Sequence, residues 1–231
     1  MTLLWQLKRG NDLYKYVTYK PKGGDALVKA AREEIYNGPG EALYAAVDTY
    51  LVDITWIAKL SWKNDTDAEQ RYSVECTTEF RITQGSEVNK GYSVASAYKG
   101  MTVTMEGQKK VLKNTETTEM KTITVDVIVP PRSRLVFYQR RYSFKSSMFF
   151  ILDTQGKDWS VCSWGGYNLS TKDCTVEVFS EDYATLETEL DGYTTGTMDV
   201  ATVSAVTGQG TFKMRENCTE RCKKKLEEMR V

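Results

Sequence analysis

Residues 85–131 read GSEVNKGYSVASAYKGMTVTMEGQKKVLKNTETTEMKTITVDVIVPP, and the fold that the sequence predicts follows from this stretch. Apolar and polar residues alternate along two limbs, as they do in strands, whose side chains point to opposite faces in turn. The apolar positions are Met101, Val103 and Met105 in the first limb and Ile123, Val125, Val127 and Val129 in the second. Gly107 and Gln108, followed by two lysines, provide a turn between the limbs. The stretch therefore predicts a long hairpin with one apolar face, one polar face and a polar middle.

The balanced charge and the missing histidine argue against several classes of function. Lysine plus arginine and aspartate plus glutamate number 31 each, so no net field draws the chain to nucleic acid. The absence of histidine removes the commonest general base and the commonest metal ligand. The glycines are spaced too widely for a dinucleotide-binding or phosphate-binding loop. We therefore expect no enzyme, no cofactor or metal ion, and no nucleic-acid partner.

The N-terminus does not resemble a secretory signal, because its short apolar start runs directly into Lys8 and Arg9. No apolar run approaches the roughly 20 residues that a membrane-spanning helix needs. The sequence therefore predicts a protein that is made in a soluble form. A mature protein whose signal has been removed would show the same pattern.

Five cysteines leave the redox state of the chain open. Cys162 and Cys174 flank a short loop, which a disulfide would close in an oxidising compartment. Buried free thiols are the alternative. Cys218 and Cys222 lie four residues apart in a charged tail over residues 217–230 that is expected to be helical, where a disulfide between them would be strained.

The residue pattern of residues 1–60 differs from that of the rest of the chain, and it predicts a small α+β unit. Tyr14 and Tyr16 belong to a short aromatic strand. Asp25 is a good N-cap for a helix over residues 26–35. Residues 41–50 are an apolar stretch that could be helix or strand, and their alanines favour a short helix. From residue 52 onward, runs of alternating residues predict strands as far as residue 206.

Three further groups of residues have both a structural and a functional interpretation. Trp159, Trp164 and Tyr167 flank a glycine pair in a predicted loop, where they would either pack in a core or contact a sugar or a lipid interface. Basic residues alternate with aromatic ones over residues 132–145, and an ordinary sheet with its polar face outward is favoured over binding of nucleic acid or phospholipid. Glu181 and Asp182 are expected to be solvated surface residues.

The chain resembles the aerolysin-type β-pore-forming proteins, which include the epsilon-toxin and mosquitocidal-toxin group. The resemblance covers residues 70–150 and rests on Phe80-Arg-Ile-Thr83, on the Ser/Thr-rich residues 85–120, on Thr122-Ile-Thr-Val-Asp-Val-Ile-Val-Pro-Pro131 and on the strand of residues 135–142. Arg132 replaces the glycine that usually follows the two prolines. The implied fold is mainly β: an elongated aerolysin-like β-sheet body over residues 61–231 with a small N-terminal α+β head over residues 1–60.

This resemblance implies a secreted, soluble protein that binds a cell-surface receptor or glycan, forms a homo-oligomer and inserts a β-barrel into the target membrane. Residues 85–120 would be the insertion hairpin, with the following candidate residues: Val94, Met101, Val103, Met105, Val111 and Thr117. Candidate contacts to receptor or lipid are Trp159, Trp164, Tyr167, Tyr14 and Tyr16. The alternative is a non-lytic β-sandwich that binds carbohydrate in the manner of a lectin, using the aromatic residues of the 159–167 loop.

Overall fold

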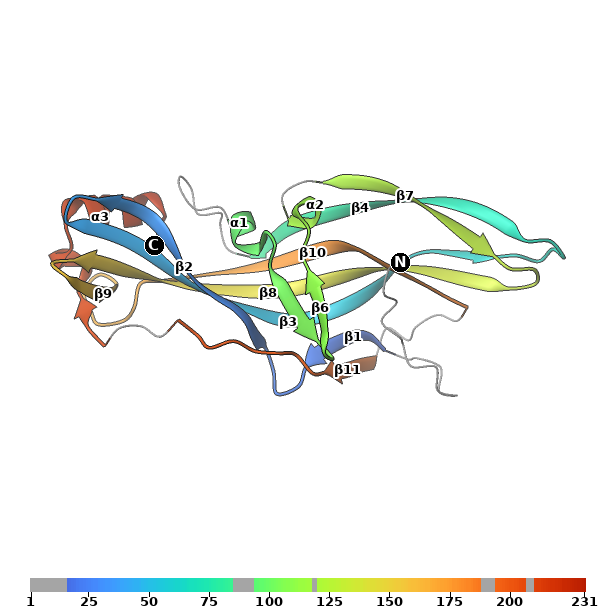
Figure 1. The fold of residues 1–231 in the computed structure, drawn as a ribbon, viewed down its shortest axis with the longest axis horizontal. Coiled ribbons are helices and arrows are strands. Elements are labelled where there is room, and N and C mark those ends of the chain that lie inside the picture. The colour runs from blue at the N-terminus through green and yellow to red at the C-terminus, as the bar shows by residue number, and fades with distance from the viewer. Residues whose placement is uncertain (1–15, 85–93, 118–119, 188–193, 207–209) are drawn as a thin grey trace.

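The computed structural model describes residues 16–84, 94–117, 120–187, 194–206 and 210–231. Long strands run nearly the whole length of the molecule, which is drawn out along one axis (Figure 1). This confirms the prediction of a mainly β, elongated body.

Three antiparallel strands form the centre of the sheet: β3 (Glu41–Lys63), β8 (Arg134–Thr154) and β10 (Thr171–Leu186). The 23 residues of β3 correspond to about 75 Å of extended chain. β3 pairs with β8 from Glu41 opposite Thr154 to Lys63 opposite Arg134, with register shifts after Leu51 and Ala58, and the strand itself continues past residue 60. The sheet thus ties the predicted N-terminal head and the body together along one strand.

Four further strands extend this sheet in the order β11-β1-β3-β8-β10-β4-β7. Their bounds are β1 (Tyr16–Pro21), β11 (Thr194–Met198), β4 (Gln70–Gln84) and β7 (Lys121–Val129). β7 pairs with β4, with Gln70 opposite Val129 and Thr78 opposite Lys121. β4 and β7 pack against β3 and β8 at one end of the molecule, where the rings of Trp62 and Tyr72 stack with their centroids 5.4 Å apart.

The two helices predicted within residues 26–50 are wrong. Residues 26–38 form the strand β2 (Ala26–Gly38), which pairs with the first half of β3 from Ala26 opposite Leu51 to Gly38 opposite Glu41. The alanines of residues 41–50 that favoured a helix are buried in β3. Hydrogen bonds and burial in the sheet outweigh helix propensities that differ by less than about 1 kcal/mol per residue.

The other end of the sheet is closed by the C-terminal helix α3 (Glu220–Glu228). The sequence predicted the helix but not its place against the sheet. Thr219 caps this helix by accepting a hydrogen bond from the backbone nitrogen of Cys222. Cys222 and Leu226 are buried against the sheet beside the short strands β9 (Lys157–Val161) and β12 (Phe212–Lys213) and the 3-10 turn η1 (Arg215–Asn217). The tail is therefore docked on the core.

All five cysteines are buried free thiols, which is the second of the two alternatives left open by the sequence. Among the described residues, no helix has the length and apolar character that a membrane span requires.

Candidate functional site

Residues 94–117 form a small unit that lies on the long sheet without joining it. It contains the helix α1 (Val94–Tyr98), the strands β5 (Thr102–Met105) and β6 (Gln108–Val111), and the helix α2 (Asn114–Thr117). β5 and β6 pair only with each other in a two-stranded sheet, which Figure 1 draws across the direction of the long strands. We call residues 94–117 the strap.

The hairpin in the strap is shorter than the sequence predicted. Glu106 and Gly107 have φ values of 48° and 75°, so they form a two-residue turn whose backbone suits the twist of the paired strands. The second limb of the predicted hairpin is β7, which pairs with β4 instead of β5. The predicted turn position is therefore right within one residue, whereas the pairing of its distant limb is wrong.

The apolar face of the strap is turned towards the sheet. Met101, Val103 and Met105 are buried on one face as predicted, and Leu112 joins them in the main core. Val94 and Thr117, two other candidate residues, are also buried, but Val111 is 52% exposed on the outer face. The strap therefore hides most of its apolar residues against the sheet and leaves its polar face, with Val111, in water.

Tyr98 anchors the start of the strap. Its ring lies edge-on to Phe80 and Phe144, with centroids 5.3 Å away in both cases. Its hydroxyl lies 2.6 Å from the hydroxyl of Ser146 on β8. This side chain fills a well-packed site and also satisfies its polar group, as buried tyrosines usually do.

The tip of the hairpin is held by residues 199–201. The backbone nitrogen of Glu106 donates to the carbonyl of Asp199 over 2.8 Å, and the nitrogen of Ala201 donates to the carbonyl of Thr104 over 2.9 Å. The carboxylate of Glu106 accepts a further hydrogen bond from the nitrogen of Asp199. The segment that follows β11 thus fastens the outer edge of β5.

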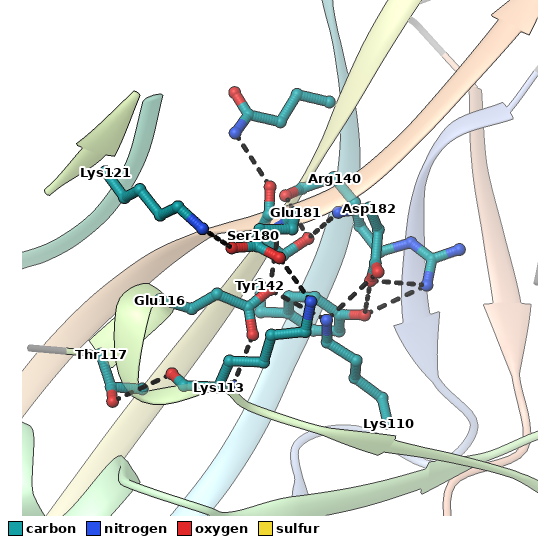
Figure 2. A network of polar contacts seen from close by, with 11 residues as sticks. Lys110, Lys113, Glu116, Thr117, Lys121, Arg140, Tyr142, Ser180, Glu181 and Asp182 are labelled. Atoms are coloured by element: carbon teal, nitrogen blue, oxygen red, sulfur yellow. Dashed lines mark hydrogen bonds and ion pairs between the residues drawn. The ribbon is translucent and has the colours of Figure 1, made fainter. Parts of the chain in front are cut away.

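A polar network fastens the other side of the strap (Figure 2). The ammonium of Lys110 lies 2.9 Å from Glu116 Oε1 and 3.1 Å from Asp182 Oδ1. Lys113 forms an ion pair with Glu181. The side chains of Glu181 and Asp182 are only 15% and 20% exposed, so the expectation that these two residues are solvated surface is wrong.

The network is built on an irregularity of β10. Phe179 lies opposite Arg141 and Tyr183 lies opposite Gln139, so residues 180–182 face Arg140 alone. Such a bulge removes backbone groups from the regular ladder. Gln139 donates through its side-chain amide to the carbonyl of Ser180 over 2.9 Å, and Glu116 Oε1 accepts from the nitrogen of Glu181 over 2.8 Å. Side chains thus replace part of the missing ladder.

The charges around Asp182 keep it ionised. Burial pushes the pKa of Asp182 up, but the charges of Lys110 and Arg140 and a hydrogen bond from Tyr142 outweigh it, so the pKa lies below its usual value. The Tyr142 hydroxyl donates to Asp182 Oδ2 over 2.9 Å. Burial in turn raises the pKa of Tyr142. The Arg140 guanidinium lies over Trp56, 4.4 Å from the ring centroid, and contacts Asp182 at 3.4 Å.

The aromatic contact candidates divide into buried and exposed ones. Trp159 packs against the main core, whereas Trp164 and Tyr167 are 52% and 74% exposed in the loop between β9 and β10. The nitrogen of Gly165 donates to Glu216 Oε1 over 2.6 Å, and Arg215 lies 5.0 Å from the ring centroid of Trp164, which together hold this loop in place. Tyr16 lies in β1. Tyr14 falls outside the described residues.

Several basic residues of 132–145 are paired with carboxylates of the protein itself, in the sheet or in the turn before β8. Arg141 forms an ion pair with Glu177 at 2.8 Å, Arg132 forms one with Asp67, and Arg140 belongs to the network at the bulge. No group of three or more potential metal ligands occurs in the part of the chain that the structure describes.

No protein-family model matches the chain, and no curated protein matches it. Among solved structures it is similar to pro-Monalysin, described as an oligomeric pore-forming toxin, with a TM-score of 0.44 and 11% identity over 74% of this chain and 72% of that chain. It is also similar to parasporin-2, a Bacillus thuringiensis toxin described as recognising cancer cells, with a TM-score of 0.19 and 17% identity over 72% of this chain and 84% of that one. TM-scores this low assign no function to the chain.

Proposed function

We propose that the chain is a β-pore-forming toxin or defence protein, and that the strap is the part that enters the membrane. The observation that supports this most directly is the separate two-stranded sheet of the strap, whose apolar face is hidden against the body. A hairpin held by its own pairing can leave the sheet without breaking the long strands. Once it leaves, Met101, Val103 and Met105 need a new apolar environment.

A lipid bilayer provides that environment only for a closed barrel, in which every backbone group is paired. One hairpin cannot close a barrel, so several copies must contribute to a homo-oligomer. A membrane strand needs about 9–11 residues, whereas β5 and β6 have four each. Insertion therefore includes conversion of α1, α2 and adjoining residues to strand, and these residues bring Val94 and Thr117 into the barrel wall.

Contact with a cell surface precedes this step. Trp164 and Tyr167 are the exposed aromatic residues that suit contact with a lipid interface or a glycan, and residues 1–60 are a second region for receptor binding. The protein would act from outside the target cell, as a secreted soluble form.

Leakage of a small dye from liposomes and from red-cell ghosts, with and without trypsin treatment of the protein, tests this function. The expected result is dye release together with an oligomer that resists SDS on a gel. Absence of leakage and of oligomer on both membranes contradicts the proposal. Binding to a glycan array without either would instead support a lectin.

A further inference from the structure

The carboxylate of Glu116 is completely buried and fastens the strap to the bulge of β10. Glu116 Oε1 accepts from the nitrogen of Glu181 over 2.8 Å and from the ammonium of Lys110 over 2.9 Å. Glu116 Oε2 accepts from the nitrogen of Lys113 over 2.6 Å, which closes the turn that begins α2. One side chain thus shapes the end of the strap and also pairs a backbone donor of the body.

A backbone nitrogen that the bulge withdraws from the ladder must be paired by another group, because an unpaired buried donor is strongly unfavourable. Glu116 is the group that pairs Glu181. The hydrogen bond is charge-assisted and shielded from water, which makes it stronger than a neutral or exposed one. No other carboxylate of the strap reaches the bulge among the hydrogen bonds described for this region.

We propose that Glu116 is the positioning residue that keeps the strap closed, and that loss of its charge opens the strap while the long sheet stays folded. This inference rests on the proposed function for its biological meaning, but closure of the strap is a property of the soluble protein and is measured without membranes. The groups that face this site are Lys110, Lys113, Lys121, Arg140, Tyr142, Glu181, Asp182 and Tyr183.

Hydrogen exchange of the soluble protein tests the proposal, with the substitution Glu116→Gln. The amide side chain keeps the shape of glutamate but loses the charge. Exchange of the paired amides in residues 102–111 is expected to accelerate by about tenfold or more, as removal of a charged hydrogen bond predicts. Exchange of the paired amides of residues 43–51, in the centre of the sheet, is expected to stay unchanged.

Glu106→Gln is the matched control. Glu106 lies in the same hairpin and its carboxylate also accepts from a backbone nitrogen, that of Asp199, but it is exposed to water. In Glu106→Gln, exchange of the amides in residues 102–111 is expected to rise less than about threefold, since an exposed hydrogen bond contributes little. Glu116→Asp keeps the charge on a shorter side chain, and it should give exchange rates between those of the wild type and Glu116→Gln. If Glu116→Gln does not fold, Glu116→Asp is the test variant. Faster exchange in residues 102–111 of Glu116→Asp then supports the proposal, and wild-type exchange there contradicts it.

The proposal would be overturned if the strap of Glu116→Gln exchanged at the wild-type rate. It would also be overturned if exchange accelerated equally in strap and sheet, because that would show a general loss of stability. A double-mutant cycle with Lys110→Met adds a second criterion, because contacting residues couple and independent ones do not. Dye release is then measured separately with liposomes. Faster exchange without leakage would support the role of Glu116 and contradict the pore-forming function, so the two hypotheses fail independently.

Discussion

Met105 at the tip of β5 lies opposite Val200 in an antiparallel pair that makes no hydrogen bonds of its own. The two flanking bonds join Glu106 to Asp199 and Ala201 to Thr104. In such a pair the Cα atoms are about 4.5 Å apart, which lies within the range that a disulfide spans. A covalent link between these positions would hold the strap on the body.

We therefore expect the double variant Met105→Cys/Val200→Cys to be inactive when oxidised. The disulfide ties the hairpin tip to residues outside the strap, so dye release from liposomes should fall to background. Reduction with dithiothreitol should restore it to at least about half of the wild-type rate. The direct opposition of the two positions favours oxidation at the introduced pair.

The single variants, treated with the same oxidant and reductant, are the controls for the loss of the Met105 and Val200 side chains. Full leakage by the oxidised double variant, with the disulfide verified by mass, would show that the strap need not leave the body.

The second prediction concerns the pH dependence of stability at Asp182. Its lowered pKa means that its contribution to stability is complete above the pKa of an unfolded aspartate, about 3.9, and is lost as pH falls through the lower pKa of the folded protein. Asp182→Asn should therefore lower the free energy of unfolding by about 1–3 kcal/mol equally at pH 7 and pH 5.

Urea unfolding of both proteins at pH 7, 5 and 3 measures this difference, which should shrink only at the lowest pH. Asp126→Asn, on the exposed face of β7, is the control and should change stability by less than about 0.5 kcal/mol. A difference that already disappears at pH 5 would mean that Asp182 is not held ionised by Lys110 and Arg140.

The exposed aromatic loop gives a third prediction. Trp164→Ala combined with Tyr167→Ala should reduce binding to liposomes or cells by about tenfold or more, as truncation of large aromatic contacts does. Stability should change by less than about 1 kcal/mol, because both side chains are largely exposed and the hydrogen bond from Gly165 to Glu216 still holds the loop.

Sedimentation with vesicles measures the binding, and Phe212→Ala serves as the control for loss of an exposed aromatic ring outside this loop. Unchanged binding of the double variant would assign the membrane or receptor contact to another part of the surface.

The thiols supply a fourth prediction. A hydrogen bond from Cys222 lowers the pKa of Cys218, whereas burial raises the pKa of Cys174 to about 11 and also raises those of Cys76 and Cys162. Because the thiolate is the reactive form and all five thiols are buried, iodoacetamide near pH 8 should react slowly overall and modify Cys218 before the other cysteines.

Mass analysis of peptides after timed quenching gives the order of modification. Cys222→Ala should remove the advantage of Cys218, and in urea all five thiols should react at similar rates. Modification of Cys174 before Cys218 in the folded protein would contradict the prediction.

Much of the fold could be predicted because strand alternation is a strong local signal. It located the apolar face of β5 and the strand β7, since each presents its pattern within a few residues. It could not decide which strands pair, and β7 was therefore assigned to the wrong partner. The strand β2 was missed for a related reason: its alanines suit a helix, and only pairing with β3 makes it a strand.

The site at the bulge could not be predicted, for a specific geometric reason. Four steps along β10, from Phe179 to Tyr183, correspond to two steps along β8. Two additional residues keep the parity of the side chains, so Val178, Ser180 and Ala184 are buried on one face. The partly exposed Asp182 between them reads in the sequence as an ordinary polar position. Glu116 likewise reads as an ordinary charged residue in a polar stretch, because the donor that it pairs lies 65 residues away.

The charged residues under the strap are divided between the strap and the body, and this division affects the cost of opening the strap. Lys110 and Glu116 both belong to the strap and can depart as a pair without net charge. Asp182 and Glu181 remain on the body, where Arg140 and Lys121 still accompany them. Parting separates Lys110 from Asp182, and it also separates Lys113 from Glu181. Lys110 and the two body carboxylates each keep a second charged partner, and Lys113 is largely exposed to water. No buried charge is therefore left without a partner, which limits the electrostatic penalty of opening.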